Sequence, residues 1–544
     1  MQVLSQEELN ADILVVGGGI AGLIAALEAR SNGANVTIVS KGKVGRSGNT
    51  LISGASISTL ISEPDFGDSF EIFYNDIMDS GKGINDKKLV EVFVKNSIEV
   101  VNTLQKYGVT FKKINNQLFR KKPPGHSVPR FIPADYSNIP YSIRGLSITL
   151  SLLRQAHKLG IKIVENTSVI KLLVSDDQVK GVVAINRRIK KVLVFYSNVV
   201  ILASGGGGGI FSKSNNTRDI TSDSYGLAYD AGVLLRDMEF TQFYPTMMYK
   251  PTRMSITNAL FGDGAILRNS LGENFMERYN EAGNMATRDV MTRAIFTEIA
   301  NGRGIDGNIF LDCRSISKNC FLREYPELYK NLLKKGVDPI KDLLYISPVY
   351  HYFIGGIVIN TKGETNLSGL LACGESVGGL HGANRLAGNA LSEAVIFGII
   401  TGRSAIKATK VKHNMSFPSY EIEHFREGKL SAKELKIRLN QGMWHYSSVL
   451  RNENSLEKEK KEINQILNSM GDVRINDISE LLSFYELNSM LTTSILVIEG
   501  ALLRKESRGA HYRTDYPYVD NTNFKGNYHF KKVNGKLNIY FRPI

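Results

Sequence analysis

Three glycines near the start of the chain, Gly17, Gly19 and Gly22, have the G-x-G-x-x-G spacing that lets a backbone bind a dinucleotide. They follow the apolar run ILVV and open an Ala-rich stretch, so they lie in a turn between a strand and a helix. Glycine suits this turn because the chain bends tightly, the pyrophosphate approaches backbone N–H groups, and the helix seats closely on the sheet. The pattern predicts a bound dinucleotide cofactor.

The type of dinucleotide does not follow from this turn alone. The next apolar strand ends at Ser40 and Lys41. A carboxylate that binds the ribose is the usual residue at that point of the fold. The fingerprint therefore leaves both nicotinamide and flavin cofactors open.

Other reactive side chains are few. Tyr244 lies in the otherwise apolar run TQFYPT, where its phenol either faces a substrate or belongs to the core. The cysteines Cys313, Cys320 and Cys373 are too few and too far apart for the usual metal or iron-sulfur ligand spacing. We predict no metal site, and cysteines that are reduced and mostly buried.

The composition is that of a folded globular protein. The 544 residues, 42% of them hydrophobic and 22% charged, suggest two to four domains, of which we expect three. The net charge of +14 is spread along the chain without a basic arm, so we expect no nucleic-acid partner. A docking face for an acidic partner or an anionic membrane stays open, and the charge would attract small anionic substrates.

Three strand-turn pieces indicate how the chain is organised. They lie in ADILVVGGGIAGLIAALEA, SNVVILASGGGGGI and GLLACGESVGGLHGANRLAGNAL, so one nucleotide-binding domain is expected with another domain inserted before the third piece. The pattern becomes helical after about residue 415. We predict a nucleotide-binding domain in two parts (1–240 and 355–412), an inserted domain (241–354), a helical domain (413–515) and a surface tail (516–544).

Several longer segments carry a resemblance to a known family. In order along the chain they are RSGNTLISG, ILASGGGG, DMEFTQFYPT, NSLGENFMERYNE, RDVMTRAI, HYFIGGIVIN, LLACGESVGGLHGANRLAGNAL and ALLRKESRGAHYRTDYP. The chain resembles the flavoprotein family of succinate dehydrogenases, fumarate reductases and L-aspartate oxidases across nearly its whole length. The resemblance implies an α/β fold: a Rossmann-like FAD-binding domain, an inserted α+β capping domain and a C-terminal helical domain.

The resemblance also implies that the dinucleotide is FAD. It places the first glycine turn on the pyrophosphate, Ser40 and Lys41 near the adenosine, Glu375 on the ribityl chain and Asn389 to Leu391 at the flavin ring. The full set of implied cofactor-binding residues is Gly17, Gly19, Gly22, Ser40, Lys41, Ser47, Gly48, Gly54, Val169, Asp223, Glu375, Asn389 and Leu391. Gly48 replaces the histidine that tethers FAD in the respiratory members, so non-covalent FAD is expected.

In the family a dicarboxylate lies against the flavin, hydride passes between flavin N5 and one carbon, and a proton passes at the other. The resemblance implies that Arg385 holds one carboxylate, because its planar fork matches a carboxylate. His351 and Thr257 would donate to the other carboxylate, and Arg288 would serve as the proton donor. Tyr244 stands where the family has a histidine and would offer a hydroxyl to the pocket.

Three further positions depart from the family pattern. Asn258 and Phe261 replace the glutamate and arginine that relay protons. Arg288 would then be recharged by Asp289, by water, or not at all. Pro123 replaces the glutamate with which aspartate oxidases read an ammonium group, although the adjoining GHS and PR pieces are similar to that branch. These departures leave the identity of the substrate open.

Three functions follow. The first is an FAD-dependent oxidoreductase acting on CH–CH bonds, the flavoprotein subunit of a succinate dehydrogenase or fumarate reductase, with an iron-sulfur subunit or another electron carrier. The second is an L-aspartate oxidase of NAD biosynthesis, and the third a diverged family flavoprotein serving electron transfer with another substrate. The first residues, MQVLSQEELNAD, lack a signal peptide pattern and no membrane span is expected, so we expect a cytoplasmic protein, with attachment to the inner face of a membrane through partner subunits left open.

Overall fold

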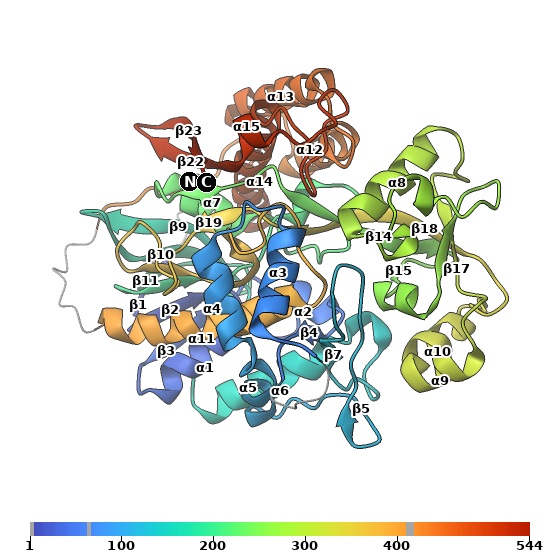
Figure 1. The fold of residues 1–544 in the computed structure, drawn as a ribbon. Coiled ribbons are helices and arrows are strands. Elements are labelled where there is room, and N and C mark those ends of the chain that lie inside the picture. The colour runs from blue at the N-terminus through green and yellow to red at the C-terminus, as the bar shows by residue number, and fades with distance from the viewer. Residues whose placement is uncertain (1–4, 62–66, 410–417) are drawn as a thin grey trace.

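A five-stranded parallel sheet carries the dinucleotide turn (Figure 1). The computed structural model describes residues 5–61, 67–409 and 418–544. The strands come from distant parts of the chain and have the order β20 (Leu370–Ala372), β12 (Val200–Leu202), β2 (Ile13–Val16), β3 (Val36–Val39) and β8 (Lys162–Val164). Most of their residues are buried, because helices or a second sheet cover both faces of a parallel sheet.

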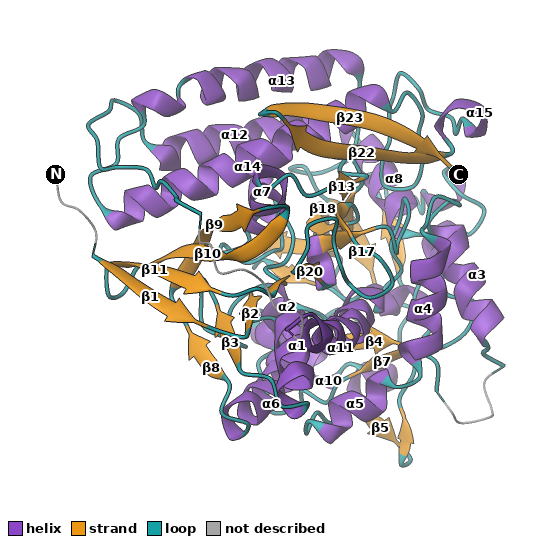
Figure 2. Cartoon of the chain, turned by 90° about the vertical axis from the view of Figure 1, so that its left-hand side faces the viewer, coloured by secondary structure: helices purple, strands orange, loops and turns teal. Residues whose placement is uncertain are grey.

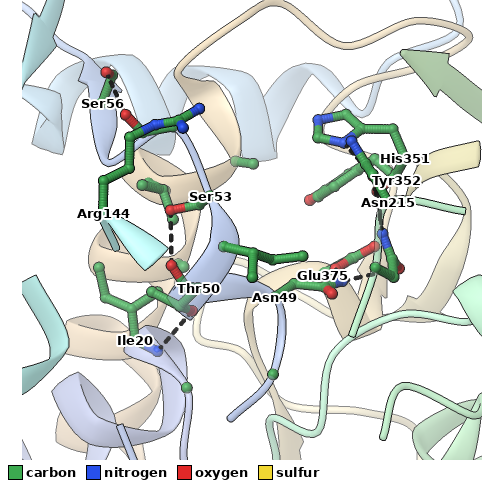
Figure 3. Close-up of a pocket in the computed structure, with 18 of the residues that line it drawn as sticks. Ile20, Asn49, Thr50, Ser53, Ser56, Arg144, Asn215, His351, Tyr352 and Glu375 are labelled. Atoms are coloured by element: carbon green, nitrogen blue, oxygen red, sulfur yellow. Dashed lines mark hydrogen bonds between the residues drawn. The ribbon is translucent and has the colours of Figure 1, made fainter. Parts of the chain in front are cut away.

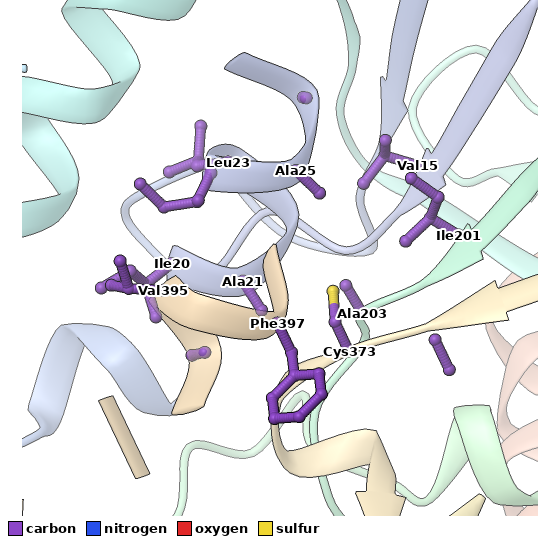
Figure 4. Packing of buried hydrophobic residues seen from close by; sticks show 14 of the residues in the cluster. Val15, Ile20, Ala21, Leu23, Ala25, Ile201, Ala203, Cys373, Val395 and Phe397 are labelled. Atoms are coloured by element: carbon purple, nitrogen blue, oxygen red, sulfur yellow. The ribbon is translucent and has the colours of Figure 1, made fainter. Parts of the chain in front are cut away.

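Two helices pack together over this sheet, α1 (Ile20–Ser31) and α11 (Asn389–Thr409). Gly402 lets them approach closely, since a Cβ atom there would lie 2.6 Å from the carbonyl oxygen of Ala25. Figure 4 shows the apolar contact between them, with Ala21 and Phe397 close together and Cys373 beside them. Helix α6 (Leu146–Lys158) packs against α1, and α4 (Lys87–Ser97) and α5 (Val100–Lys106) pack against α11.

A second sheet lies beside the parallel one (Figure 2). Its order is β1 (Gln6–Asn10), β11 (Lys191–Tyr196), β10 (Gln178–Asn186) and β9 (Thr167–Ser175). Shorter elements complete this half of the molecule: α2 (Asn49–Ile52), β4 (Ser56–Ser58), α3 (Phe70–Ser80), β5 (Lys113–Ile114), β6 (Gln117–Leu118), β7 (Phe131–Pro133) and α7 (Asp223–Asp230).

The inserted segment forms an antiparallel sheet with helices at its side (right of Figure 1). The strand order is β15 (Met254–Ser255), β14 (Thr241–Lys250), β18 (Leu344–Phe353), β17 (Ile309–Asp312) and β16 (Ile266–Arg268). The helices are α8 (Arg288–Ala300), α9 (Lys318–Glu324) and α10 (Pro326–Lys334). Strands β14 and β18 pair side by side and bring Tyr244 next to Val349, two residues from His351.

Three long helices follow, α12 (Ala432–Ser447), α13 (Glu453–Asn468) and α14 (Ile478–Leu503). Among the described residues α14 alone is long and apolar enough to cross a membrane. About two thirds of its apolar window (67%) is buried against the rest of the protein, as in the core helix of a globular domain. Its apolar character is therefore explained by packing.

The segment 516–544, interpreted above as a surface tail, contains the short helix α15 (Asn521–Phe524) and a hairpin of β22 (Gly526–Val533) and β23 (Lys536–Pro543). Strand β22 is largely buried because it joins β13 (Leu235–Arg236), β19 (Gly356–Val358) and β21 (Val377–Gly378) in one sheet. The predicted fold class, a mixed α/β fold with a C-terminal helical region, is confirmed by the whole arrangement.

Candidate active site

One cavity runs from the glycine turn after β2 to the antiparallel sheet (Figure 3). It brings together most of the site residues predicted from the sequence, although they come from segments hundreds of residues apart. Those that line it are Gly17, Gly19, Ser40, Lys41, Ser47, Gly48, Gly54, Asp223, Tyr244, Thr257, Arg288, His351, Glu375, Arg385 and Leu391.

Three predicted cofactor residues lie outside the lining of this cavity. A Cβ atom on Gly22 would lie 2.1 Å from the carbonyl oxygen of Gly17, so Gly22 serves the close packing of the turn against α1. Val169 lines a small neighbouring hollow together with Lys41 and Asp223. Asn389 begins α11 and is buried.

The turn itself has the geometry that a dinucleotide needs. Gly17 has φ +123°, and a Cβ atom there would lie 2.2 Å from the carbonyl oxygen of Ala203. The N–H of Ile20, at the start of α1, donates to Thr50 Oγ1 at 3.2 Å. Both amide atoms of Asn389 are buried without a protein partner. A buried amide without hydrogen-bond partners is costly. The glycine turn, which leaves no room for side chains, and the unpaired amide of Asn389 together fit a bound FAD.

Lys41 is held by ion pairs that the sequence did not reveal. Its Nζ lies 2.6 Å from Asp223 and 3.2 Å from Glu486 on α14. Burial lowers the pKa of Lys41, but the two carboxylates outweigh it and raise the pKa above its ordinary value. The Lys41 charge thus ties the nucleotide-binding sheet to the helical region.

Glu375 is half-buried at the end of the cavity near His351. Its Oε2 accepts from Asn49 Nδ2 at 3.1 Å, and its Oε1 accepts from the N–H of Phe353 at 3.3 Å. Burial outweighs these two bonds and raises the pKa of Glu375 to about 7. The carboxyl group therefore holds its proton in the folded, ligand-free protein below neutral pH.

A pH-dependent stability follows from this shift. An unfolded chain releases the Glu375 proton near the ordinary pKa, whereas the folded chain keeps it up to about 7. The FAD-free protein is therefore expected to lose stability, by about 3 kcal/mol, as pH rises from the ordinary value through 7. Glu375→Gln, which mimics the protonated acid, should flatten that part of the profile in urea unfolding. Parallel profiles of the two proteins would contradict the assignment.

Arg385 is a buried cation without an acid partner among the described residues. Its Nη2 donates to Gln242 Oε1 at 2.8 Å, its Nη1 donates to the carbonyl of Leu386 at 3.0 Å, and its Nε has no partner. The guanidinium lies over the ring of Tyr352, 4.4 Å from the centroid. Burial lowers the pKa of Arg385. An anion that reaches this fork would supply the missing charge.

Arg288 begins α8 and faces the same glutamine. Its Nη1 donates to Gln242 Oε1 at 3.4 Å, and its Nε donates to Asn258 Oδ1 at 3.2 Å. Burial, and then the charge of Arg385, lowers the pKa of Arg288 to about 9. Sequence reasoning missed Gln242, which joins the two arginines; its place in TQFYPT was the available signal.

His351 is a neutral donor. Burial, followed by the charges of Arg288 and Arg385, holds its pKa well below the ordinary value. Its Nδ1 lies 3.1 Å from Asn215 Oδ1, which is a hydrogen bond if this nitrogen carries the proton. A neutral imidazole beside two arginines keeps the positive charge on the guanidinium groups.

Tyr244 borders the cavity with its ring. Its hydroxyl donates to the carbonyl of Ile256 at 2.6 Å, and its ring lies 5.0 Å from that of His351 and 5.1 Å from the Arg288 guanidinium. Thr257 Oγ1 accepts from the N–H of Ala259 at 3.3 Å, which leaves the hydroxyl hydrogen of Thr257 free to donate. The hydroxyl hydrogen of Tyr244 is therefore bonded within the protein, whereas that of Thr257 is available to a ligand.

The hypothesis that Asp289 recharges Arg288 finds no support in the contacts. The Asp289 carboxylate accepts from Thr287 and from Asn384 Nδ2 at 2.9 Å, and it lies 3.6 Å from Arg293. It points away because α8 places adjacent residues on different sides. Asn258 donates to Thr246 and Phe261 packs in the apolar core. Among the described residues no acid contacts Arg288.

Comparison with known proteins identifies the family of the chain. Residues 12–391 match the family model described as FAD binding domain, and residues 436–544 match the model described as fumarate reductase flavoprotein C-term. An uncharacterised FAD-dependent oxidoreductase of Methanocaldococcus jannaschii is 35% identical over 94% of both chains. A fumarate reductase (CoM/CoB) subunit of Methanothermobacter marburgensis is 34% identical over 94% of this chain and 96% of its own.

Solved structures and other relatives extend the comparison. A chain of E. coli quinol fumarate reductase superposes with a TM-score of 0.89 at 25% identity, covering 99% of this chain and 97% of that one. Other relatives, each 30% identical, are named L-aspartate oxidase and succinate dehydrogenase flavoprotein subunit. The protein is an FAD-dependent oxidoreductase, and the chain belongs to the flavoprotein family of fumarate reductases, succinate dehydrogenases and L-aspartate oxidases.

Proposed function

We propose that this protein is the flavoprotein subunit of a succinate dehydrogenase or fumarate reductase type enzyme, in which FAD exchanges hydride with a small dicarboxylate. The observation that carries the proposal is a pair of arginines, the half-buried Arg288 and the buried Arg385, which share Gln242 and have no ion-pair partner among the described carboxylates. Two uncompensated cations in one cavity suit a ligand with two negative charges.

The contacts suggest a role for each residue. Arg385 binds one carboxylate through its fork, and its stacking on Tyr352 holds the fork in place. The free hydroxyl hydrogen of Thr257 donates to the other carboxylate. His351 does so too, in the tautomer that carries its proton on Nε2 while Nδ1 accepts from the side-chain amide of Asn215. Arg288 gives a proton to the carbon chain, which its lowered pKa of about 9 favours over an ordinary arginine. Since Asn258 cannot relay protons, water entering the cavity resupplies Arg288.

FAD is proposed to be bound without a covalent link. Gly48 lines the cavity at the position where the resemblance places the tethering histidine. Precipitation of the purified protein with acid is expected to release all of the flavin into the supernatant, because no bond would survive to hold it. The absorbance of the supernatant and of the washed pellet measures the release. Flavin that stays with the pellet would contradict a non-covalent site.

A partner is part of this proposal. The cysteines Cys313 and Cys373 are buried and Cys320 is half-buried. Cys313 and Cys320 belong to the core of the inserted segment, whereas Cys373 packs in the core of the nucleotide-binding part. Electrons would therefore leave through an iron-sulfur subunit or another electron carrier. The relative from Methanothermobacter marburgensis is itself named as a subunit, which supports an assembly of this kind. Such an assembly would place the chain in the cytoplasm or at the inner face of a membrane.

Anaerobic stopped-flow of the dithionite-reduced protein tests the proposal. Addition of fumarate should reoxidise the flavin rapidly, and the 450 nm absorbance reports it. An FAD-replete protein that fumarate leaves reduced would contradict the proposed reaction and leave the third hypothesis, electron transfer with another substrate.

We propose that Tyr244 borders the substrate cavity with its ring and that its hydroxyl does not bind the substrate. Tyr244→Phe removes a hydroxyl whose only partner among the described residues is the carbonyl of Ile256. We therefore expect dicarboxylate affinity within about threefold of the parent and a stability loss of about 1 kcal/mol. Calorimetric titration of the anaerobically reduced protein with succinate, which the reduced flavin cannot oxidise, measures the affinity, and urea unfolding measures the stability. A tenfold loss of succinate affinity would mean that the hydroxyl turns to the ligand.

L-aspartate oxidase remains the second candidate, favoured by the relatives of that name and by the GHS stretch at Gly125 to Ser127. His126 in this stretch is buried and lies 2.9 Å from the carbonyl of Ala387, next to the arginine fork. Pro123 lines the cavity but offers no carboxylate to an ammonium group. L-aspartate should therefore reduce the oxidised flavin far more slowly than succinate does.

A further inference from the structure

Arg144 is a third arginine of the cavity, and neither the family resemblance nor the proposed reaction gives it a role. It lines the same cavity as Arg288 and Arg385, and only 7% of it is exposed. Within the described part of the chain, no carboxylate lies within ion-pair distance of it. A buried guanidinium without an anion is costly, so its position indicates a ligand that supplies the charge.

The side chain is held firmly in place. Its guanidinium lies 4.1 Å from the ring centroid of Tyr141, and its Nη1 donates to the carbonyl of Tyr141 at 2.8 Å. The hydroxyl of Tyr141 donates to the carbonyl of Ser255 at 3.2 Å, two residues before Thr257. Through Tyr141, Arg144 is therefore held close to β15 and to Thr257, whose hydroxyl is proposed to donate to the substrate.

Figure 3 places the Arg144 guanidinium across the cavity from His351, beside Ser53 and Ser56. The hydroxyls of both serines bond to nearby backbone carbonyls, at Thr50 and Gly54, and do not engage Arg144. The remaining nitrogens of Arg144 are therefore directed at open space within the cavity.

Two lysines that line the cavity on the side of Arg144, Lys112 and Lys121, are already engaged by protein groups. Lys121 is paired with Asp263 and Glu324 of the inserted segment. Lys112 donates to the carbonyls of Arg323 and Glu324 at 3.0 and 2.7 Å. The rest of the wall is largely aromatic and apolar: Phe119, Phe131, Pro133, Tyr136 and Tyr141. Arg144 is the charge on this wall that the described protein leaves unmatched.

We infer that Arg144 binds a third anionic group on the substrate, so that the preferred substrate is a tricarboxylate or a dicarboxylate with a further anionic substituent. The inference rests on the proposed function, because two carboxylates are assigned to Arg385 and to His351 with Thr257. A four-carbon dicarboxylate has no charge left for Arg144. The aromatic wall offers room for the longer or branched carbon skeleton that would carry one.

Equilibrium binding to the FAD-loaded protein, kept reduced under anaerobic conditions, tests the inference without turnover, because a reduced flavin cannot take hydride from a saturated acid. The heat of binding is measured by calorimetric titration with tricarballylate, a saturated tricarboxylate, and with succinate. The parent should bind tricarballylate roughly tenfold or more tightly than succinate, as a charge-assisted pair provides. Arg144→Gln should remove that preference and leave succinate affinity within about threefold, and Arg144→Lys should keep part of the preference.

Lys112→Gln is the matched control, since it removes a cation of the same wall whose donors are engaged by carbonyls. It should leave the tricarballylate preference intact. Three outcomes would overturn the inference. The first is an equal loss of tricarballylate affinity in both glutamine variants, and the second is an equal loss of affinity for both acids in Arg144→Gln. The third is a changed flavin content and spectrum in Arg144→Gln before any acid is added. In the last case the flavin is the partner of Arg144.

The two proposals fail differently. Reduced protein is mixed anaerobically with fumarate and with trans-aconitate, an unsaturated tricarboxylate. If neither reoxidises the flavin while tricarballylate binding depends on Arg144, the proposed reaction is wrong and the third anion site stands. If fumarate reoxidises it and Arg144→Gln leaves tricarballylate binding unchanged, the reaction stands and the inference is wrong.

Discussion

Replacement of Arg288 by alanine is expected to lower the rate of flavin reoxidation by fumarate by about 10⁴-fold, with FAD content unchanged. The rate falls because the variant lacks both the proposed proton donor and one of the charges that stabilise the developing carbanion. Arg288 contacts Gln242 and Asn258, and no described acid. The loss should therefore appear in the chemical step, measured by single-turnover stopped-flow at saturating fumarate.

Arg293, five residues further along α8, is the matched control. It donates to the carbonyl of Gly509 at 2.8 Å and lies 5.1 Å from the ring centroid of Tyr512, away from the two arginines of the site. Arg293→Ala should keep a reoxidation rate within about threefold of the parent. Equal rates in Arg288→Ala and in the parent would remove Arg288 from the reaction and leave water or another group as the acid.

Replacement of Glu506 by alanine should cause the largest loss of stability, about 3–5 kcal/mol, because it removes one carboxylate from buried Arg504 and leaves buried Arg508 without an ion-pair partner among the described residues. Glu506 Oε1 lies 3.1 Å from Arg504 Nη1 and 2.7 Å from Arg508 Nε, and all three side chains are almost fully buried. Arg504 has Glu239 as a second partner at 2.6 Å. Arg508 has no second carboxylate partner among the described residues, so its buried charge would be the one left unpaired.

The control removes an acid of the same type from the surface. Glu7 pairs with Lys191 at 3.1 Å, and the two side chains are 44% and 41% exposed. Glu7→Ala should cost less than about 1 kcal/mol, since water screens the pair. Urea unfolding followed by circular dichroism compares the two variants. If Glu506→Ala unfolds at the same urea concentration as Glu7→Ala, water reaches the cluster and the arginines are not buried in solution.

The buried cluster also explains a sequence motif. ESRGAHYR is part of one of the segments that carry the family resemblance, but its residues do not line the cavity. Arg451 donates to the carbonyl of Glu239 at 2.7 Å and to Thr241 at 2.8 Å, and its Nη1 lies 2.9 Å from His511 Nδ1 within the motif. The motif thus anchors the helical region to the first residue of β14, the strand that carries Gln242 and Tyr244.

Much of the fold and the cofactor-binding part of the site could be predicted because they depend on local sequence. Gly17, Gly19 and Gly22 act through backbone conformation and close packing within a single turn, so their spacing alone indicates a dinucleotide. The buried strands and the helix after each glycine turn are likewise encoded in short apolar runs. The same holds for the family membership, which rests on contiguous motifs.

Pairing of charges was decided only by the tertiary structure. Lys41 meets Glu486 from a helix more than 400 residues away, Arg144 has no acid partner in the described part of the chain, and Gln242 joins the two arginines of the site. The direction of the Tyr244 hydroxyl was equally invisible in TQFYPT. The sequence determined which reactive groups the protein has and which backbone turns bind its cofactor. The fold decided which of those groups are neutralised and which stay free for a ligand, because electrostatic partners are chosen by distance in space and not along the chain.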